Sequence, residues 1–277
     1  MEYSFLLGSD MDYTLLMPGK PISDVNLRAA RALRDAGGAL TISTGRSSFI
    51  TNIYTDVLGT DIPIITSNGA SIFDPVSRKE IYSSLIPDDI CRKLLSLFID
   101  NDSNATCYSP DGIFYAPGSL RRDFISNYNR DLPDDKKAPV GEITRDMLDG
   151  GLPPINKFLL IDPDEETLAV VRDTEGLETV SSAGGFYDIM KEGNSKGDGL
   201  LRVADILGIS HDMTFAIGDS ENDLSMIRSA KYGIAMKNSD PRLLKDASYV
   251  TGICEEDGFA TAVFDYILPL IKTLRSR

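Results

Sequence analysis

The stretch FLLGSDMDYT, residues 5–14, decides how this chain folds. Its apolar start, Phe5-Leu6-Leu7, predicts a short buried strand. Side chains two residues apart in an extended chain point to the same side, so Asp10 and Asp12 present two carboxylates at the end of that strand. Neighbouring carboxylates repel one another, and ligands of open α/β sheets bind at the carboxyl ends of the strands. The pair therefore predicts a cation site or a phosphoryl-transfer site.

Outside its middle part, the chain alternates strands with helices. Further strands are predicted at residues 39–43, 63–66, 213–217, 232–236 and 249–251. Helices are predicted between Ser23 and Gly37 and at residues 200–207, 221–229 and 259–268. Strands that alternate with helices form parallel sheets joined by right-handed crossovers. We therefore expect an α/β fold with a Rossmann-like parallel sheet.

The middle of the chain has a different order of elements. Pro87 starts a helix, and Pro110-Asp111-Gly112 predicts a turn between two strands. A later helix can be capped by Asp162 or Asp164. Strand and helix runs of this kind are typical of a separate α+β module inserted into the core. We expect an inserted domain at residues 84–185 and a core made of residues 1–83 and 186–277.

The formal net charge of -14 disfavours nucleic acid and anionic membranes as partners. It also repels anionic substrates, unless a metal or a local basic group reverses the field at the site. The N-terminus is not basic, and no apolar run approaches the ~18 residues that a membrane span needs. The expected partner is therefore a small molecule, and the sequence does not predict the oligomeric state.

The three cysteines, Cys91, Cys107 and Cys254, are an odd number and lack Cys-x-x-Cys spacing. Free thiols in a reducing cytoplasm are the simplest interpretation, and we expect a cytoplasmic protein without a zinc site or disulfide framework. The single histidine, His211, lies in a predicted loop without an accompanying Ser or Cys nucleophile motif. We expect it to have no catalytic role.

Four motifs far apart in the sequence end at predicted strand or helix tips. They contribute Asp10 with Asp12, Thr44, Lys196, and Asp219 with Asp223. A parallel sheet gathers the carboxyl ends of its strands at one edge, so these side chains are expected to face one pocket. Carboxylate oxygens at such a site suit Mg²⁺ better than zinc.

Each motif also has a simpler interpretation. The Asp10 pair could be a solvated turn, and Asp219 and Asp223 could cap the helix that follows them. A calcium loop is a further alternative, but Leu15 and Leu224 stand where the sharp turn of that loop needs glycine. We therefore reject the calcium loop. The combination of all four motifs in this order is much less expected by chance than any one of them.

The chain resembles the haloacid dehalogenase-like (HAD) superfamily, and within it the Cof-like branch of sugar-phosphate phosphatases with a type IIB (C2B) cap. The matching segments are residues 10–14, 43–46, 67–70, 195–197, 217–223 with Met226, 233–238 and 256–258. They span nearly the whole chain. One residue departs from the pattern: Tyr13 stands where the family usually has glycine. The middle module carries no motif that names a substrate.

This resemblance implies a phosphatase reaction and assigns roles to the motif residues. Asp10 would be the nucleophile that forms an aspartyl-phosphate, and Asp12 the general acid and then the general base. Mg²⁺ would be held by the Asp10 carboxylate, the backbone carbonyl of Asp12 and Asp219. Asp223 would orient metal-bound water or act as a direct ligand.

The resemblance also implies a phosphate-binding set. Thr44 and Lys196 would hold the phosphoryl oxygens. The backbone amides of Met11 and Gly45, together with Asn222, are further candidate donors. Substrate-side contacts are expected from Arg46, Asn68, Lys157, Tyr187 and Asp188.

The inserted domain is expected to close over the site as a cap, hinging near residues 82–87 and 184–186. The expected function is Mg²⁺-dependent hydrolysis of small phosphorylated metabolites, above all hexose phosphates. Two alternatives stay open. One is a sugar phosphomutase of the same superfamily, and the other is a phosphosugar-binding regulator without catalysis, although no motif residue is missing.

Overall fold

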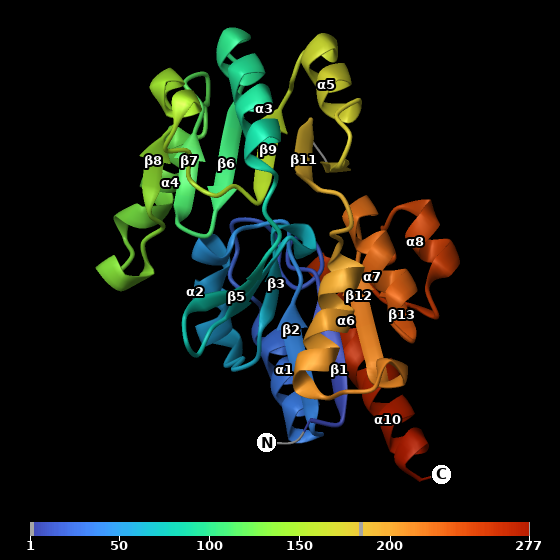
Figure 1. Ribbon diagram of the computed structural model, residues 1–277. Coiled ribbons are helices and arrows are strands. Elements are labelled where there is room, and N and C mark those ends of the chain that lie inside the picture. Colours follow the sequence, from blue (N-terminus) through green and yellow to red (C-terminus); the bar gives the residue numbers. More distant parts are fainter. Residues whose placement is uncertain (1–2, 183–184, 277) are drawn as a thin grey trace.

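A computed structural model describes residues 3–182 and 185–276. It consists of an α/β core and a second, smaller module that stands on the carboxyl edge of the core sheet (Figure 1). The core sheet has the strand order β14-β13-β12-β1-β2, and every neighbouring pair is parallel. The predicted α/β class with a parallel sheet is therefore confirmed.

The five core strands are β1 (Phe5–Ser9), β2 (Gly38–Ile42), β12 (Thr214–Gly218), β13 (Tyr232–Ala235) and β14 (Tyr249–Val250). All five residues of β1, β2 and β12 are buried, because helices cover both faces of the sheet. Alternate residues of β1 serve the two faces: Phe5 and Leu7 pack into one apolar cluster, and Leu6 packs into the other.

One face of the core sheet is covered by α1 (Asp24–Asp35), α9 (Gly258–Thr261), η7 (Ala262–Ile267) and α10 (Leu268–Arg275). The opposite face is covered by α6 (Lys196–Leu207), α7 (Leu224–Ser229) and α8 (Pro241–Asp246). The predicted start of α1 and the predicted end of α6 are confirmed. The Ser23 hydroxyl caps α1 by accepting from the amide of Asn26, and Gly208 ends α6 in a left-handed conformation.

The predicted helix at residues 259–268 consists of three consecutive helical segments, of which η7 is a π-helix. Pro269 lies in the first turn of α10. Proline has no N–H and its ring excludes the carbonyl four residues earlier, so a wider helical turn before it accommodates the chain. No helix in the described parts of the chain is both long and apolar enough to cross a membrane.

An antiparallel extension continues the core beyond β2. It is formed by β3 (Ile64–Thr66), β4 (Ser71–Asp74) and β5 (Lys79–Ser83), and Ser43 bridges in parallel to Ile65. The helix α2 (Ser48–Leu58) connects β2 to this extension. The loop between β3 and β4 is the short helix η1 (Ser67–Gly69).

The inserted module is built on a six-stranded sheet of order β10-β11-β9-β6-β7-β8. Its strands are β6 (Ala105–Ser109), β7 (Gly112–Tyr115), β8 (Val140–Glu142), β9 (Lys157–Ile161), β10 (Leu177–Ser182) and β11 (Phe186–Lys191). The helices α3 (Asp88–Asp100) and α5 (Glu165–Arg172) pack on one face, and α4 (Arg122–Arg130) on the other. Asp164, one of the two predicted caps, accepts from the amide of Thr167 at the start of α5.

Within residues 3–182 and 185–276, five further short 3-10 helices lie in the connections. They are η2 (Asp134–Lys136), η3 (Arg145–Asp149), η4 (His211–Met213), η5 (Glu221–Asp223) and η6 (Cys254–Glu256).

Strand pairing shifts one predicted domain boundary. The boundary placed after residue 185 falls before β11, yet β11 pairs with β9 and β10 in the sheet of the module. We therefore propose an inserted domain of residues 84–191. The predicted hinge at residues 184–186 begins with Gly184, which lies outside the described residues.

Candidate active site

The core sheet brings the four predicted motifs to one edge. Asp10 directly follows β1, which lies at the centre of the sheet between β12 and β2. Thr44 follows β2, and Asp219 follows β12. Lys196 begins α6, and Asp223 ends the short helix η5. These residues therefore meet because parallel strands end on the same side.

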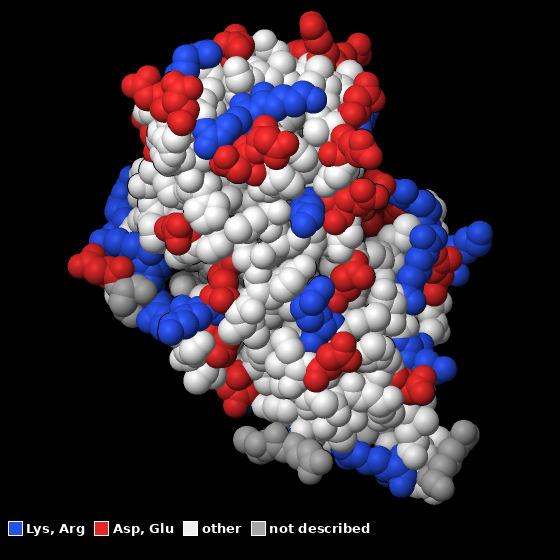
Figure 2. Space-filling model, in the orientation of Figure 1, with Lys and Arg blue, Asp and Glu red and all other residues white. Residues whose placement is uncertain are grey.

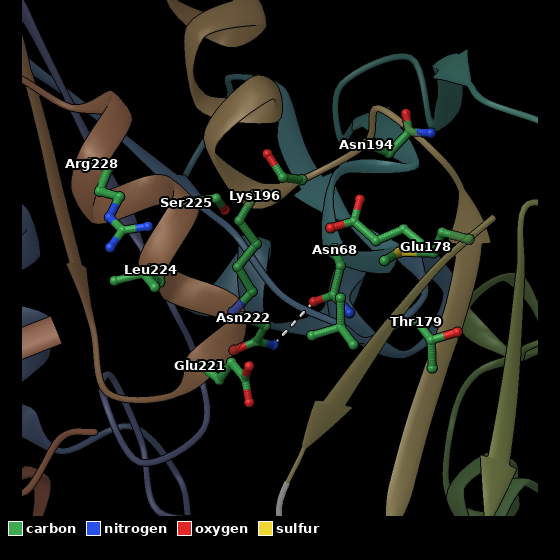
Figure 3. A pocket seen from close by; sticks show the side chains of 13 residues that line it. Asn68, Glu178, Thr179, Asn194, Lys196, Glu221, Asn222, Leu224, Ser225 and Arg228 are labelled. Carbon is green, nitrogen blue, oxygen red and sulfur yellow. Dashed lines mark hydrogen bonds between the residues drawn. The ribbon is translucent and has the colours of Figure 1, made fainter. Parts of the chain in front are cut away.

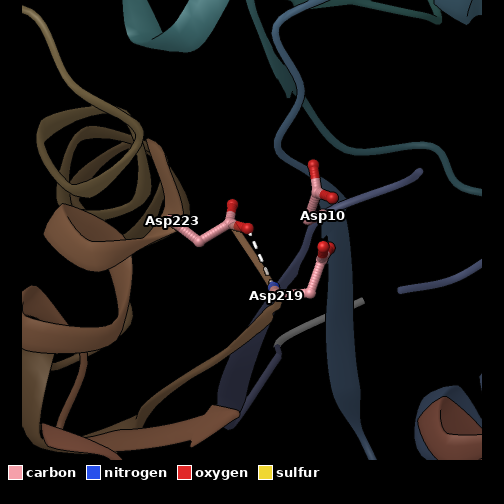
Figure 4. Close-up of side chains that lie close together, drawn as sticks. All are labelled: Asp10, Asp219 and Asp223. Carbon is pink, nitrogen blue, oxygen red and sulfur yellow. Dashed lines mark hydrogen bonds between the residues drawn. The ribbon is translucent and has the colours of Figure 1, made fainter. Parts of the chain in front are cut away.

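Asp10, Asp219 and Asp223 form a cluster of carboxylates (Figure 4). One carboxylate oxygen from each lies within 4.8 Å of the others. Lys196 is buried beside them, and its Nζ donates to Oδ1 of Asp10 and to Oδ1 of Asp223, each at 2.6 Å. Three negative charges therefore share one ammonium group.

This imbalance changes the protonation of the cluster. Burial is the largest cause that raises the pKa of Asp10 well above its usual value, and the nearby Asp223 carboxylate raises it further. Burial and Asp223 also raise the pKa of Asp219. Burial alone would lower the pKa of Lys196, but Asp10 and Asp223 raise it above the usual lysine value. The three carboxylates offer oxygen donors and excess negative charge, which fits a divalent cation such as Mg²⁺.

The loop after β12 is held in place by its own side chains. Oδ2 of Asp223 accepts from the amides of Asp219 and Ser220, both at 3.0 Å, so the capping role considered for Asp223 is also present. The hydroxyls of Thr14 and Ser220 donate to the two oxygens of Asp219, at 2.9 and 2.8 Å. Thr14 and Ser220 lie within two of the matching segments, but no role was predicted for either.

Asp12 turns away from the carboxylate cluster and pairs with Arg46. The guanidinium contacts both carboxylate oxygens, with Nε donating at 2.9 Å and Nη2 at 2.5 Å. Asp12 is not among the clustered carboxylates. The expected metal contact of Asp12, through its backbone carbonyl, stays a prediction. Arg46, expected on the substrate, lines the cavity and uses its guanidinium to hold Asp12.

Tyr13, the departure from the family pattern, has a left-handed backbone with φ of 60°. The loop around it closes tightly, because the amides of Leu15 and Leu16 both donate to the carbonyl of Met11 at 2.9 Å. Glycine adopts this conformation freely, whereas other residues lose roughly 1–2 kcal/mol. The side chain of Met11 is buried in the core, so only its backbone can face the site.

A cavity of about 500 Å³ opens above the motif residues, between core and module. Its core side is lined by Asp10, Asp12, Tyr13, Pro18, Thr44, Gly45, Arg46, Ile50, Asp219, Ser220 and Asn222. Its module side is lined by Tyr108, Arg121, Phe124, Lys157, Leu159, Phe186 and Asp188. Five of the module residues, all except Lys157 and Asp188, were not predicted, because they follow no motif.

A hydrogen-bonded chain crosses from core to module beside this cavity. Nδ2 of Asn222 donates to Oδ1 of Asn68 at 3.1 Å, and Nδ2 of Asn68 donates to Asp188 at 2.8 Å. Asp188 pairs with Lys157 at 2.5 Å, and Nζ of Lys157 also donates to the carbonyl of Gly45 at 2.7 Å. We call these five residues the interdomain chain. Lys157 and Asp188, expected on the substrate, here tie the two domains together.

Gly69 explains why the loop after β3 approaches the start of α6. Its φ is +93°, and a Cβ there would lie 2.0 Å from the carbonyl oxygen of Ser195. Only glycine permits this approach. Tyr187, expected near the substrate, does not line the cavity; its ring lies 5.8 Å from the guanidinium of Arg172. Successive strand residues face opposite sides, and Asp188 occupies the cavity side.

A second cavity, of about 270 Å³, is lined by Lys196 and lies between the module strands and the helices α6 and α7. Figure 3 shows Glu178 and Thr179 from the module opposite Asn222 and Arg228 from the core. Lys196 lines this cavity while its Nζ contacts Asp10.

The residues that were expected to have no catalytic role are His211 and the three cysteines. His211 contacts Asp205 at the surface, at 2.8 Å. The three cysteines are free and buried.

Comparisons with known proteins identify the family of this chain. A family model described as haloacid dehalogenase-like hydrolase matches residues 7–263. The chain is 27% identical over 270 residues to pyridoxal phosphate phosphatase YbhA of Escherichia coli, covering 95% of this chain and 98% of that protein. It is 32% identical over 278 residues to 5-amino-6-(5-phospho-D-ribitylamino)uracil phosphatase YwtE of Bacillus subtilis, covering 91% and 94%.

Solved structures show the same fold. A haloacid dehalogenase-like hydrolase from Bacillus subtilis superposes with a TM-score of 0.78 at 25% identity, covering 95% of this chain and 99% of that one. A HAD subclass IIB sugar phosphatase gives a TM-score of 0.79 at 22% identity, covering 95% and 99%. The resemblance seen in the motifs is confirmed: this chain belongs to the haloacid dehalogenase-like hydrolases.

Proposed function

We propose that this protein is a Mg²⁺-dependent phosphatase that hydrolyses phosphate esters of small metabolites through an aspartyl-phosphate on Asp10. The observation that carries the proposal is the buried ion pair of Lys196 with Asp10, within a cluster of three carboxylates that borders the cavity of about 500 Å³. The relatives named as phosphatases for pyridoxal phosphate and for a phosphorylated ribitylaminouracil support the same reaction class.

The contacts of Asp10 support its proposed role as the nucleophile. Lys196 contacts only Oδ1 of Asp10, and Oδ2 has no hydrogen-bond partner among the residues that the structure describes. In the proposed step, Oδ2 forms a bond to phosphorus and the ester P–O bond breaks. Water then hydrolyses the aspartyl-phosphate and releases inorganic phosphate.

Asp12 would supply the proton that the leaving alkoxide needs. Asp12 lines the cavity and would carry a proton for this step: its O–H bond breaks as the ester P–O bond breaks, and the proton passes to the leaving oxygen. The carboxylate that remains would pair with the guanidinium of Arg46. In the second step the same carboxylate would take a proton from water. General acid–base catalysis of this kind contributes ~10²–10⁴-fold in rate.

The residues present fit Mg²⁺. Asp10, Asp219 and Asp223, with the backbone carbonyl of Asp12, would hold the ion. When bound, it supplies positive charge that offsets the repulsion between a carboxylate and a phosphate dianion. Thr44, Lys196, Asn222 and the amides of Met11 and Gly45 are proposed to hold the phosphoryl oxygens.

The substrate is proposed as a small phosphorylated metabolite. Hexose phosphates, expected from the motif resemblance, remain a prediction. The free cysteines support the predicted cytoplasmic location.

The test measures phosphate release from a panel of sugar, nucleotide and cofactor phosphates. Asp10→Asn should reduce release to background while the protein keeps its far-UV circular dichroism and thermal midpoint within a few degrees. Chelation of divalent cations should abolish the activity of the unaltered protein, and Mg²⁺ should restore it.

Two outcomes would contradict the proposal. Near-normal turnover by Asp10→Asn removes this residue as the nucleophile, and turnover in excess chelator removes the metal. An isomerised product in place of inorganic phosphate would favour the mutase alternative.

A further inference from the structure

The end of the 500 Å³ cavity that lies against the module is rich in aromatic and aliphatic groups. The side chains that form it are Tyr108, Phe124, Leu159 and Phe186 from the module, and Ile50 of the core belongs to the same apolar cluster as Tyr108, Leu159 and Phe186. Two rings that line the cavity are unusually accessible for large apolar groups: Phe124 on the module side is 48% exposed, and Tyr13 on the core side is 46% exposed. A ligand that covers them would remove their apolar area from water.

Arg121 lies at the same end. Its guanidinium carbon is 4.3 Å from the centre of the Phe124 ring and 5.7 Å from that of Phe186. Its side chain has no ion-pair or hydrogen-bond partner within residues 3–182 and 185–276. The other two cations that line the cavity are paired: Arg46 with Asp12, and Lys157 with Asp188. Arg121 is therefore a cation that can bind a ligand without losing a carboxylate partner.

These surroundings suit a flat ring better than a hexose. Each sugar hydroxyl that enters the cavity needs a hydrogen-bond partner, and a buried hydroxyl without one weakens binding. Asp188 and Lys157 already use their charges on one another. A flat aromatic ring presents few polar groups, and its contact with another ring strengthens binding beyond the burial of apolar area.

We infer that the preferred substrates are phosphate esters of alcohols that carry a flat aromatic ring with an anionic or carbonyl substituent. Phe124 contacts the ring, and Arg121 binds the substituent. The inference rests on the proposed phosphatase function, because it names the substrate class of the same site. The cavity volume of about 500 Å³ accommodates such a ring together with its phosphate.

Three synthetic esters test this inference with nearly the same leaving group. They are benzyl phosphate, cyclohexylmethyl phosphate and 4-carboxybenzyl phosphate, all esters of a primary alcohol. For the unaltered enzyme, kcat/KM should be about threefold to tenfold higher for the benzyl than for the cyclohexylmethyl ester, because only the former stacks. The carboxylate should add about tenfold more through a charge-assisted contact with Arg121.

Variants assign the two contacts. Arg121→Gln should bring the ratio of kcat/KM between 4-carboxybenzyl and benzyl phosphate close to one. Phe124→Leu should lower the ratio between benzyl and cyclohexylmethyl phosphate. The matched control is Arg122→Gln: Arg122 is the next residue, pairs with Glu142 at the surface and does not line the cavity. It should leave both ratios unchanged.

The outcomes separate this inference from the function on which it rests. Equal kcat/KM for the three esters, or the same ratios in Arg121→Gln and Arg122→Gln, would overturn it while phosphatase activity stands. A higher kcat/KM for glucose 6-phosphate than for any benzyl ester would also overturn it. No phosphate release from any of the four compounds would contradict the proposed function as well.

Discussion

At the level of single residues, the charges around Asp10 oppose folding and favour cation binding. Three buried or half-buried carboxylates lie around one ammonium, and the pKa values of Asp10 and Asp219 are raised as a result. When folding raises the pKa of a carboxyl group, the protonated carboxyl stabilises the folded protein. This stabilisation is complete below the pKa of the group in the unfolded chain, near 3.8, and is lost as the pH rises through the raised pKa of the folded protein.

Asp219→Asn tests this charge balance. In excess chelator, the variant should have a higher thermal midpoint than the unaltered protein at pH 7.5, because the amide that replaces the carboxyl group cannot ionise. The difference should shrink as the pH falls through the raised pKa of Asp219 towards the unfolded value of 3.8, because Asp219 then loses its charge first in the folded protein and last in the unfolded chain. With Mg²⁺ at about 100 times its dissociation constant, the free energy of unfolding of the unaltered protein should rise by about 2.7 kcal/mol, and that of the variant by much less.

Scanning calorimetry at several pH values gives the midpoints. A difference that stays constant from pH 4 to 7.5 would show that Asp219 does not carry the effect. Equal gains from Mg²⁺ in both proteins would remove Asp219 as a ligand.

Some site residues could be predicted because their positions follow from the strands. Asp10, Thr44 and Asp219 each lie just past a buried run of apolar residues, and parallel pairing alone brings them together. Tyr13 could be recognised as a departure from the family pattern. Its left-handed backbone could not, because it depends on the hydrogen bond from the amide of Tyr13 to the carbonyl of Leu16 and on the closing of the loop. Arg121 could not be predicted, since only packing of the module places it at the cavity.

At the level of elements, the interdomain chain links β9 and β11 of the module to the loops after β2 and β3. Lys157 is 3% exposed and Asp188 is 9% exposed, so their ion pair is buried where the two domains meet. A second ion pair between the domains, Lys136 with Asp56, is far more accessible, with Asp56 65% exposed. Both ion pairs therefore join the core to the module, but one is buried and the other is exposed to solvent.

We expect the buried pair to contribute much more than the exposed one. Lys157→Met or Asp188→Asn alone should reduce the free energy of unfolding by about 3–5 kcal/mol, because each leaves a buried charge or its partner unpaired. In the double variant, the decrease in the free energy of unfolding should be smaller than the sum of the two single decreases. In the control Asp56→Asn, the decrease should be under about 1 kcal/mol.

Urea unfolding at equilibrium measures all four variants. Additive losses in the double variant would show that Lys157 and Asp188 do not act as a pair. A loss in Asp56→Asn as large as that in Asp188→Asn would show that burial does not distinguish the two contacts.

The elements themselves were predicted unevenly. Most core strands were expected near their observed positions, because continuous buried runs are distinctive. The helix α2 was not predicted: Ile50, Thr51, Ile53 and Thr55 are β-branched, which favours strands, and packing against the core overrides that preference. The strand β11 was assigned to the core, because its partners β9 and β10 are known only from the folded sheet.

At the level of the whole molecule, the net charge of -14 repels the dianionic esters that the proposed function requires. On the face drawn in Figure 2, acidic and basic side chains are interspersed over both the module and the core. The negative field that the excess of acidic groups produces therefore acts on an approaching ester mainly at long range, since neighbouring acidic and basic side chains offset one another nearby. Salt reduces such a field, because the screening length falls from about 30 Å at 0.01 M to about 8 Å at 0.15 M.

We predict that kcat/KM for a dianionic ester rises with ionic strength over this range, by a few fold, because repulsion during approach is screened. An ester that also carries an ammonium group has a smaller net charge and should show a shallower rise. The measurement is kcat/KM at constant free Mg²⁺ with added potassium chloride. A fall in kcat/KM for the dianionic ester would show instead that local positive charge dominates the field at the cavity.

The exposed ring of Phe124 offers an optical probe of the cavity. The chain contains no tryptophan. An indole introduced by Phe124→Trp would therefore be the sole long-wavelength emitter, placed where a ligand enters and beside the guanidinium of Arg121. Its emission would follow ligand arrival and departure in real time, including for compounds that are bound and never hydrolysed.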